Sequence, residues 1–231
     1  MSMAIDKSFP FLIILFISSI QSSCVKKDEL LEDNKLQEYR FDQKSLELHV
    51  GNTIQITSKG KISAWKSSKK FVGTIEDDGT FTAHHIGKTK ISAKIDDKNH
   101  SLEIKVIPNI TDIPEPVSFY GKTKNQITSL EKRKVIIDKN DVLSYDTNSD
   151  LIETMYYLFQ GGKATYAVFK FKMLEKTNLD YLLKFYEERY EYLGLTKNNH
   201  YFTDEKKKRL IAVSIKPPFT ALYSAYKEKE D

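Results

Sequence analysis

The stretch from Leu46 to Val106, LELHVGNTIQITSKGKISAWKSSKKFVGTIEDDGTFTAHHIGKTKISAKIDDKNHSLEIKV, decides the fold of the amino-terminal half of this chain. Apolar and polar residues alternate over residues 46–50 and again over residues 53–57, with Gly51-Asn52 between them. A period of two predicts strands with one buried face, and the intervening turn predicts a hairpin. The same alternation returns three more times before Val106. The stretch is therefore expected to be all β.

Turn residues and one aromatic residue indicate how these strands pack. Turn signals at Asp77-Asp78-Gly79 and at Gly87 recur at the spacing of short antiparallel strands. Trp65 is the only tryptophan in the chain, and a lone tryptophan among short strands usually lies between two facing sheets. We expect a small antiparallel sandwich whose stability depends on Trp65, because the segment has no cysteine for a disulfide.

The order of turn and core residues along the segment also forms a family pattern. Its parts are Leu46-x-Leu48-x-x-Gly51-x-Thr53, Trp65-x-Ser67-Ser68, Val72-x-x-Ile75-x-x-Asp78-Gly79-x-Phe81-x-Ala83, Gly87-x-Thr89-x-Ile91-x-Ala93 and Ile104-x-Val106. In this order the segment, residues 43–107, resembles the bacterial Ig-like domain, group 2. The resemblance implies an Ig-like sandwich that acts as a spacer or an adhesion module.

Residues 1–23 have the composition of an export signal. The apolar run from Phe9 to Ile20 is too short to span a bilayer as a helix but suits a secretory signal. Ser22-Ser23 then precede Cys24, the only cysteine of the chain. This ending resembles a bacterial lipoprotein signal, which implies that a lipid is attached to Cys24. Gln21 departs from that pattern, in which an aliphatic residue stands three places before the cysteine, and the alternative is an ordinary cleaved signal with an incidental cysteine.

The residues that follow Cys24 are expected to form a polar tether over residues 24–42. Lys27-Asp28-Glu29, close to the cysteine, resembles the surface-export signal of Bacteroidota lipoproteins. The resemblance implies an outer membrane lipoprotein of the cell envelope that is exposed at the cell surface. Exposure to the periplasm is the alternative.

A second domain is expected over residues 117–228, after a linker over residues 108–116 that contains three prolines. Its pattern is α+β, with a short helix capped by Thr123, a hairpin turning at Gly161-Gly162, and a second helix over residues 177–193 that Gly194 ends.

Each half of this second domain is predicted to contain a helix and three strands. We therefore expect tandem helix plus three-stranded antiparallel units that share one sheet. The order of elements resembles that of β-lactamase inhibitor protein. Glu187, Glu188, Arg189 and Glu191 lie off the apolar stripe of the second helix, and we interpret them as a solvated face rather than a catalytic pair.

Tyrosines are the candidate binding residues of the second domain. Exposed aromatic rings bind sugars or peptides, whereas the alternative is that the rings cover the core with their hydroxyls at its rim. Adjacent residues of a strand face opposite sides, so one of each adjacent pair is expected to be exposed. The candidates are Tyr156, Tyr157, Tyr166, Tyr223 and Tyr226.

Other chemistry is not indicated by the sequence. The net charge of +4 is small and the lysines are scattered, so nucleic acid is not an expected partner. His84 and His85 would point to opposite faces of a strand, so no metal is expected there. His200 has no nucleophile elbow near it and no phosphate loop is present, so we expect neither an enzyme nor a cofactor.

The leading hypothesis is a non-enzymatic cell-envelope lipoprotein in which the Ig-like module carries a carboxyl-terminal domain that binds a protein or a glycan. The alternative is an inhibitor-like or regulatory protein whose carboxyl-terminal domain binds a partner enzyme. A hydrolase with convergent carboxylates in a cleft is a third hypothesis.

Overall fold

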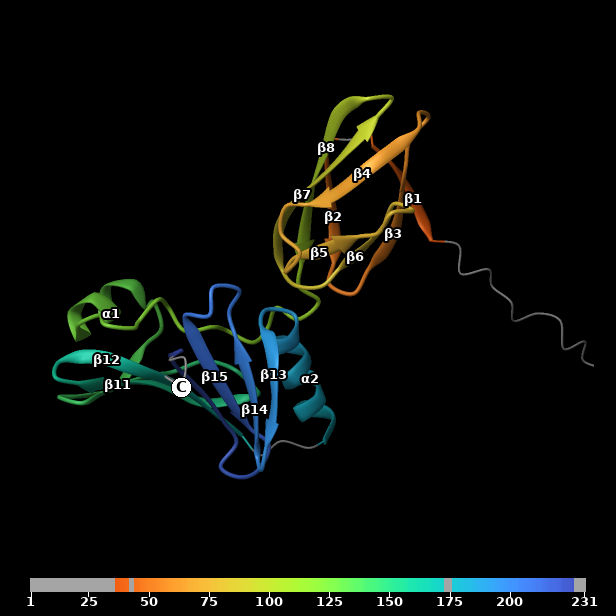
Figure 1. The fold of residues 1–231 in the computed structure, drawn as a ribbon. Helices are drawn as coiled ribbons and strands as arrows, with labels where there is room; N and C mark the ends of the chain where they lie inside the picture. Colours follow the sequence, from red (N-terminus) through yellow and green to blue (C-terminus); the bar gives the residue numbers. More distant parts are fainter. Residues whose placement is uncertain (1–35, 42–43, 173–175, 227–231) are drawn as a thin grey trace, which may run out of the picture. The chain divides into compact units, whose positions relative to one another are not determined.

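The computed structural model describes residues 36–41, 44–172 and 176–226. Within these residues the chain is mostly β, with sixteen strands and two short helices (Figure 1). None of the described helices has the length and apolar character needed to cross a membrane. The predicted signal, Cys24 and the tether up to Lys35 lie outside the described residues.

Two four-stranded sheets form the amino-terminal part, which we call the sandwich. One sheet has, in spatial order, β1 (Gln37–Arg40), β3 (Thr53–Thr57), β6 (Thr80–Ala83) and β5 (Gly73–Ile75). The other has β2 (Ser45–His49), β8 (Lys98–Ile107), β7 (Gly87–Ile95) and β4 (Ile62–Ser67). Side chains from both sheets join one buried cluster, so the architecture is compatible with the predicted all-β sandwich.

The turn at Gly51-Asn52 connects the two sheets and does not close the predicted hairpin. Strand β2 pairs in parallel with β8, whereas β3 pairs in parallel with β1 and antiparallel with β6. The hairpin prediction is wrong because alternation reports that a strand has one buried face but not which strand lies beside it. Strand β1 and the buried Phe41 also belong to the sandwich, within residues expected to be tether.

Trp65 lies at the margin of the sandwich core. Its ring is partly buried and packs on Phe41, with ring centroids 5.4 Å apart. The ladder between β4 and β7 is irregular between Ser63 and Lys66, and Ala64 there has a φ of 54°. This irregularity turns Trp65 away from the position predicted for it, and Phe81, which is completely buried, fills the centre.

The carboxyl-terminal part is built on one eight-stranded antiparallel sheet, which we call the large sheet. Its spatial order is β13 (Glu191–Thr196), β14 (Asn199–Thr203), β15 (Arg209–Ser214), β16 (Thr220–Ala225), β12 (Lys163–Phe171), β11 (Ile152–Gln160), β10 (Val142–Tyr145) and β9 (Val135–Lys139). Four strands follow each of the helices α1 (Lys124–Leu130) and α2 (Lys176–Glu187), so the predicted count of three is wrong. The last strands of the two sets, β12 and β16, pair at the centre of the sheet.

Local signals of this part were read correctly from the sequence. Thr123 caps α1 in a capping box with Gln126, and the prediction of this cap is confirmed. Gly161 and Gly162 have φ of 55° and 73° and join β11 to β12, which confirms the predicted hairpin.

Helix α2 ends at Glu187, six residues before its predicted end at residue 193. Residues beyond it form β13, which pairs with β14, and Gly194 lies at an irregularity of this ladder with a φ of 128°. The helical stripe therefore predicted Tyr186 correctly as a buried residue, but Leu193 lies exposed on a strand. Hairpin pairing of β13 with the next strand, β14, overrides the helical periodicity of these residues.

Both helices pack on the same face of the large sheet. Ile127 of α1 and Leu182 of α2 belong to one buried cluster with side chains of the sheet. Ile110 and Ile113, from the segment expected to be a linker, are buried in the same cluster. The predicted linker thus contributes apolar side chains to this core.

Candidate functional site

Ladder register defines two faces of the large sheet. One row, paired in turn across six strands, is completely buried under the helices and consists of Leu143, Tyr157, Ala167, Tyr223, Ile211 and Phe202. The Tyr223 hydroxyl donates to the Tyr186 hydroxyl of α2 at 3.0 Å. This row is the core of the carboxyl-terminal part.

The opposite face is covered by neither α1 nor α2, and we call it the helix-free face. The row that crosses its middle carries no charged residue over all eight strands. Its members, paired in turn, are Ile137, Ser144, Tyr156, Val168, Leu222, Ala212, Tyr201 and Gly194. Ser144 and Val168 are buried, Ile137 is exposed, and the other five members are partly exposed. An uncharged row of this length is unusual for a sheet face that is even partly open to water, because such faces normally carry polar and charged residues.

An open hollow of about 360 Å³ lies at one side of the helix-free face. Backbone bonds of 2.8 Å, from the Gly121 amide to the Ala164 carbonyl and from the Ala164 amide to the Lys122 carbonyl, hold the Tyr120 segment beside β12. Among the described residues, no charged side chain lines the hollow. Its lining consists of Tyr120, Gln160, Thr165, Tyr166, Leu210, Ser224 and Ala225.

Two of the five predicted tyrosines lie in the core and cannot present a ring to a ligand. The Tyr157 hydroxyl donates to the Glu131 carboxylate and accepts from the Val117 amide, both at 3.1 Å. Burial raises the pKa of Tyr157, and burial also raises the pKa of Tyr223. The prediction of Tyr157 and Tyr223 as binding residues is therefore corrected, because these rings fill the space between the sheet and its helices.

The other predicted tyrosines are partly exposed. Tyr156 and Tyr166 lie on the helix-free face of neighbouring strands, as diagonal neighbours in the ladder, and Tyr166 lines the hollow. Tyr226 follows β16, where its amide donates to the Lys208 carbonyl. Sequence reasoning separated Tyr156 from Tyr157 by alternation, and the same argument applied to Tyr201-Phe202 would have found Tyr201. It gave no signal for Tyr120, which the chain brings to β12 from outside the sheet.

A buried ion pair was missed. The Arg189 guanidinium donates to the Glu188 carboxylate at 3.2 Å, and both side chains are almost fully buried. Glu188 also accepts from the amides of Asn109 and Ile110, each at 3.2 Å, and Arg189 donates to the Ile110 carbonyl at 2.7 Å. The interpretation as a solvated face is wrong for Glu188 and Arg189, because the 109–110 backbone covers them and supplies their partners, whereas Glu187 and Glu191 are exposed as predicted.

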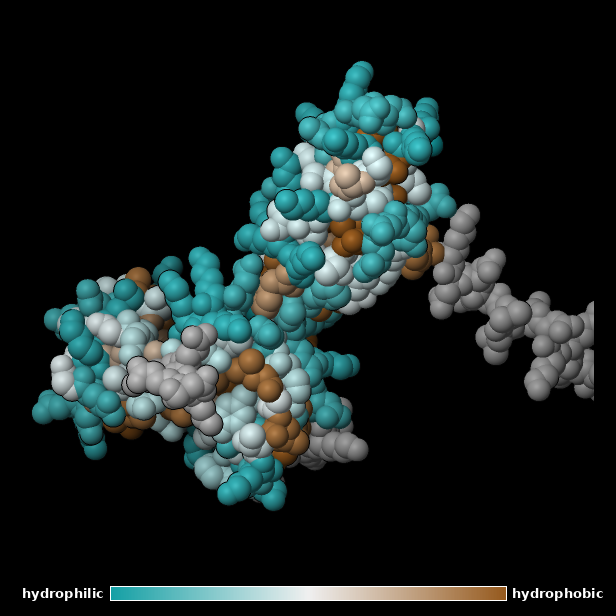
Figure 2. All heavy atoms as spheres, viewed as in Figure 1, coloured by the Kyte–Doolittle hydropathy of each residue, from teal (hydrophilic) through white to brown (hydrophobic). Residues whose placement is uncertain are grey.

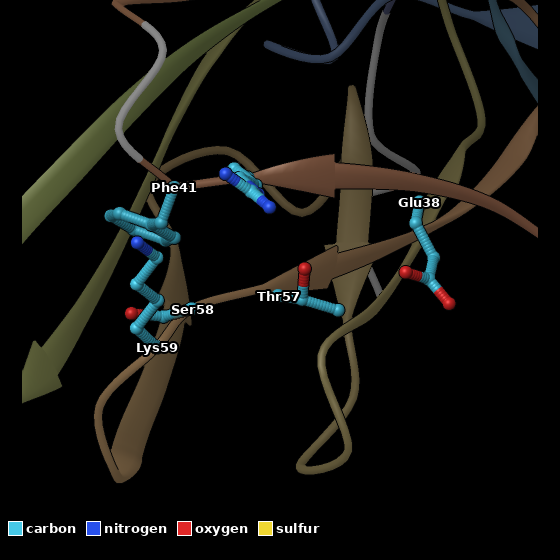
Figure 3. A pocket seen from close by; sticks show the side chains of 6 residues that line it. Glu38, Phe41, Thr57, Ser58 and Lys59 are labelled. Carbon is cyan, nitrogen blue, oxygen red and sulfur yellow. The ribbon is translucent and has the colours of Figure 1, made fainter.

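A hollow of the sandwich gathers charges of both signs. It has a volume of about 420 Å³ and is lined by Glu38, Arg40, Phe41, Thr57, Ser58 and Lys59. Figure 3 shows Lys59 beside Phe41, with Glu38 at the other end of β1. Within the part of the chain that the structure describes, Glu38 and Lys59 lie at opposite ends of this hollow.

The adjacent histidines His84 and His85 of the sandwich are engaged separately. The His84 ring nitrogen Nε2 lies 2.8 Å from the Thr74 hydroxyl, and His85 Nδ1 lies 2.6 Å from the Phe71 carbonyl. Burial, with a smaller effect from His85, lowers the pKa of His84. Among the described residues no three histidine, cysteine or carboxylate side chains are grouped to hold a metal ion.

Comparison with known proteins adds no assignment. No model of a known protein family matches the chain, and no curated protein matches it. The Ig-like resemblance and the lipoprotein signal therefore stay predictions, and the function has to be argued from the helix-free face.

Proposed function

We propose that this protein is a non-enzymatic cell-envelope lipoprotein whose carboxyl-terminal part binds a ligand on the helix-free face. In this proposal Cys24 carries the lipid, the outer membrane holds the anchor, and the sandwich is an Ig-like spacer or adhesion module. The observation that supports binding is the uncharged row of eight residues together with the tyrosine-lined hollow beside it.

We also propose a finer description of the fold. The sandwich is a bacterial Ig-like domain of group 2, and the carboxyl-terminal part arose from two copies of one helix-and-strands unit. The supporting features are the order of one helix and four strands, found twice, and the pairing of the two final strands at the centre.

The hollow has the chemistry to take a neutral ligand. Tyr120 and Tyr166 offer rings, whereas Gln160 and Ser224 offer an amide and a hydroxyl that make no hydrogen bond to the described residues. Aromatic rings combined with a few polar groups bind ligands that have both apolar and hydroxyl-bearing surfaces. The ligand proposed here is therefore a neutral glycan or an uncharged surface of a protein.

Loss of one ring tests this site. A panel of neutral polysaccharides and envelope proteins is first screened for a ligand that binds the unchanged chain. Tyr166→Ala is expected to weaken the binding of that ligand at least tenfold, or about 1.4 kcal/mol. Tyr181→Ala is the matched control, because Tyr181 is a partly exposed tyrosine of α2 on the opposite side of the sheet. Binding that survives Tyr166→Ala and Tyr120→Ala would remove the hollow from the proposal.

The alternative, binding of a partner enzyme, makes a different use of the same face. A protein partner would cover the row across the sheet, so Tyr156→Ala and Leu222→Ala would weaken binding as much as Tyr166→Ala. A glycan held in the hollow would depend on Tyr166 and Tyr120 and would be affected little by Leu222→Ala. The pattern of loss over these four variants thus separates the two candidates.

The proposed anchor is tested by metabolic labelling. In intact cells fed a palmitate analogue, the chain is expected to be labelled and the label to disappear in Cys24→Ala, because Cys24 is the only thiol of the chain. External protease should then remove the labelled protein if it faces the medium. Label that persists in Cys24→Ala would contradict the lipoprotein proposal, and protection from protease would favour the periplasmic side.

A further inference from the structure

Exposed apolar side chains gather on the two edge strands of the large sheet. On β13, Tyr192, Leu193 and Leu195 are between 42% and 52% exposed, and on β9 three consecutive aliphatic residues are between 38% and 56% exposed. Hydrophobic atoms gather in the region of β13 in Figure 2. Edge strands of natural sheets are normally protected by charges or proline, because an open edge pairs with other chains. Each of these edges could therefore pair with a strand of another chain.

Ladder register assigns the side chains of β13 to faces. Tyr192 pairs with Phe202 and Leu195 pairs with His200, which places both on the helix side. Glu191 and Thr196 pair with Thr203 and Asn199 and lie on the helix-free side. Leu193 is the extra residue at the irregularity between them.

We propose that β13 pairs antiparallel with β13 of a second copy of this chain, about a twofold axis between Leu193 and Gly194. Tyr192 then lies opposite the second copy's Leu195, and Leu195 lies opposite the second copy's Tyr192. Both apolar pairs stay on the helix side, because the register of each strand places them there. The dimer would continue the large sheet from one copy into the next.

Charges on β13 agree with this pairing. Glu191 is the only charged residue of the strand. In the twofold register it lies opposite Thr196 of the second copy and beside Lys197, an opposite charge. No like charges face one another, so the self-pairing meets no electrostatic penalty at its edges.

Strand β9 fails the same test. A twofold axis at Ile137 would place the charged Asp138 opposite Ile136. An axis at Ile136 would pair Val135 with Ile137, which lie on opposite faces because the ladder shifts register between Ser144 and Tyr145. The Lys139 carbonyl also accepts a hydrogen bond from the Lys124 ammonium, which occupies one edge group. The dimer is therefore assigned to β13.

Dimer formation is measured by sedimentation velocity of the exported chain carrying Cys24→Ser. This substitution removes the thiol, so the chain carries no lipid at that position and cannot form a disulfide there with a second copy. A dimer that dissociates on dilution is expected. Leu195→Lys is expected to yield a monomer at every concentration tested, because two cations would enter the apolar pairs, whereas Ile136→Lys on β9 should leave the dimer intact. Thermal unfolding of each variant would confirm that the exposed substitutions leave the fold in place.

Register is tested by a crosslink. The double variant Tyr192→Cys, Leu195→Cys should form a disulfide-linked dimer on mild oxidation, because residues opposite one another in an antiparallel pair have Cα atoms about 4.5–5.5 Å apart. Leu195→Cys alone has no opposing cysteine and should not crosslink. A chain that stays monomeric, or a dimer that Ile136→Lys dissociates and Leu195→Lys does not, would overturn the proposal.

Discussion

Replacing Glu188 with alanine is expected to destabilise the carboxyl-terminal part by about 3–5 kcal/mol, the range for removing one partner of a buried ion pair. The carboxylate accepts from two backbone amides, at Asn109 and Ile110, and from the Arg189 guanidinium, all at 3.2 Å. Without it, Arg189 would keep a buried positive charge whose remaining partners are the Ile110 and Phe185 carbonyls and, at 3.9 Å, the half-exposed Glu115 carboxylate. The loss therefore combines a weakly compensated buried charge with two orphaned amides.

The matched control is Glu187→Ala, one residue away. Glu187 is exposed at the last position of α2, so its loss should change stability by no more than about 0.5 kcal/mol. Unfolding in urea is followed by near-ultraviolet circular dichroism, whose tyrosine signal reports mainly on the large sheet. Trp65 fluorescence reports on the sandwich and separates the two transitions. Equal effects of the two substitutions would contradict the burial and bonding of Glu188.

Glu188 shows where sequence reasoning stops. A cluster of acids after a helical stripe has the same pattern whether it meets water or a covering segment, and nothing near Glu188 in the sequence indicates that residues 109–110 return to it. The end of α2 was missed for a different reason, because the helical spacing of Tyr186, Tyr190 and Leu193 continues into β13, which forms a tight hairpin with β14. Contacts between distant residues are not encoded in local periodicity.

Features that depend on neighbours in the sequence were predictable. Thr123 and Gln126 are three residues apart and form a capping box, and two successive glycines made a hairpin turn. Alternation separated Tyr156 from Tyr157 and so found part of the helix-free face. The hollow was not predictable, because Tyr120 reaches it through backbone bonds to Ala164 that join segments over forty residues apart.

The predicted central position of Trp65 in the sandwich core is wrong for a local reason. A large aromatic residue among strands predicts a central position only if the alternation of its strand is regular. The left-handed Ala64 and the shifted ladder break that regularity in β4. Trp65 is only partly buried, and the completely buried aromatic residue of this core is Phe81, a smaller ring on a regular strand.

Phe81→Ala is accordingly expected to destabilise the sandwich by about 3–5 kcal/mol, the range for truncating a buried aromatic ring. The ring is completely buried and lies so close to Gly73 that a Cβ atom on that glycine would come within 2.3 Å of it. The backbone of β5 approaches the ring directly, so truncation would leave a cavity in the sandwich core above β5, where the backbone cannot easily move in to fill it. Trp65→Ala should cost less, since part of its ring already meets water. Thermal unfolding followed by far-ultraviolet circular dichroism compares the two variants without relying on the tryptophan signal, and a larger loss for Trp65→Ala would return the tryptophan to the centre of the core.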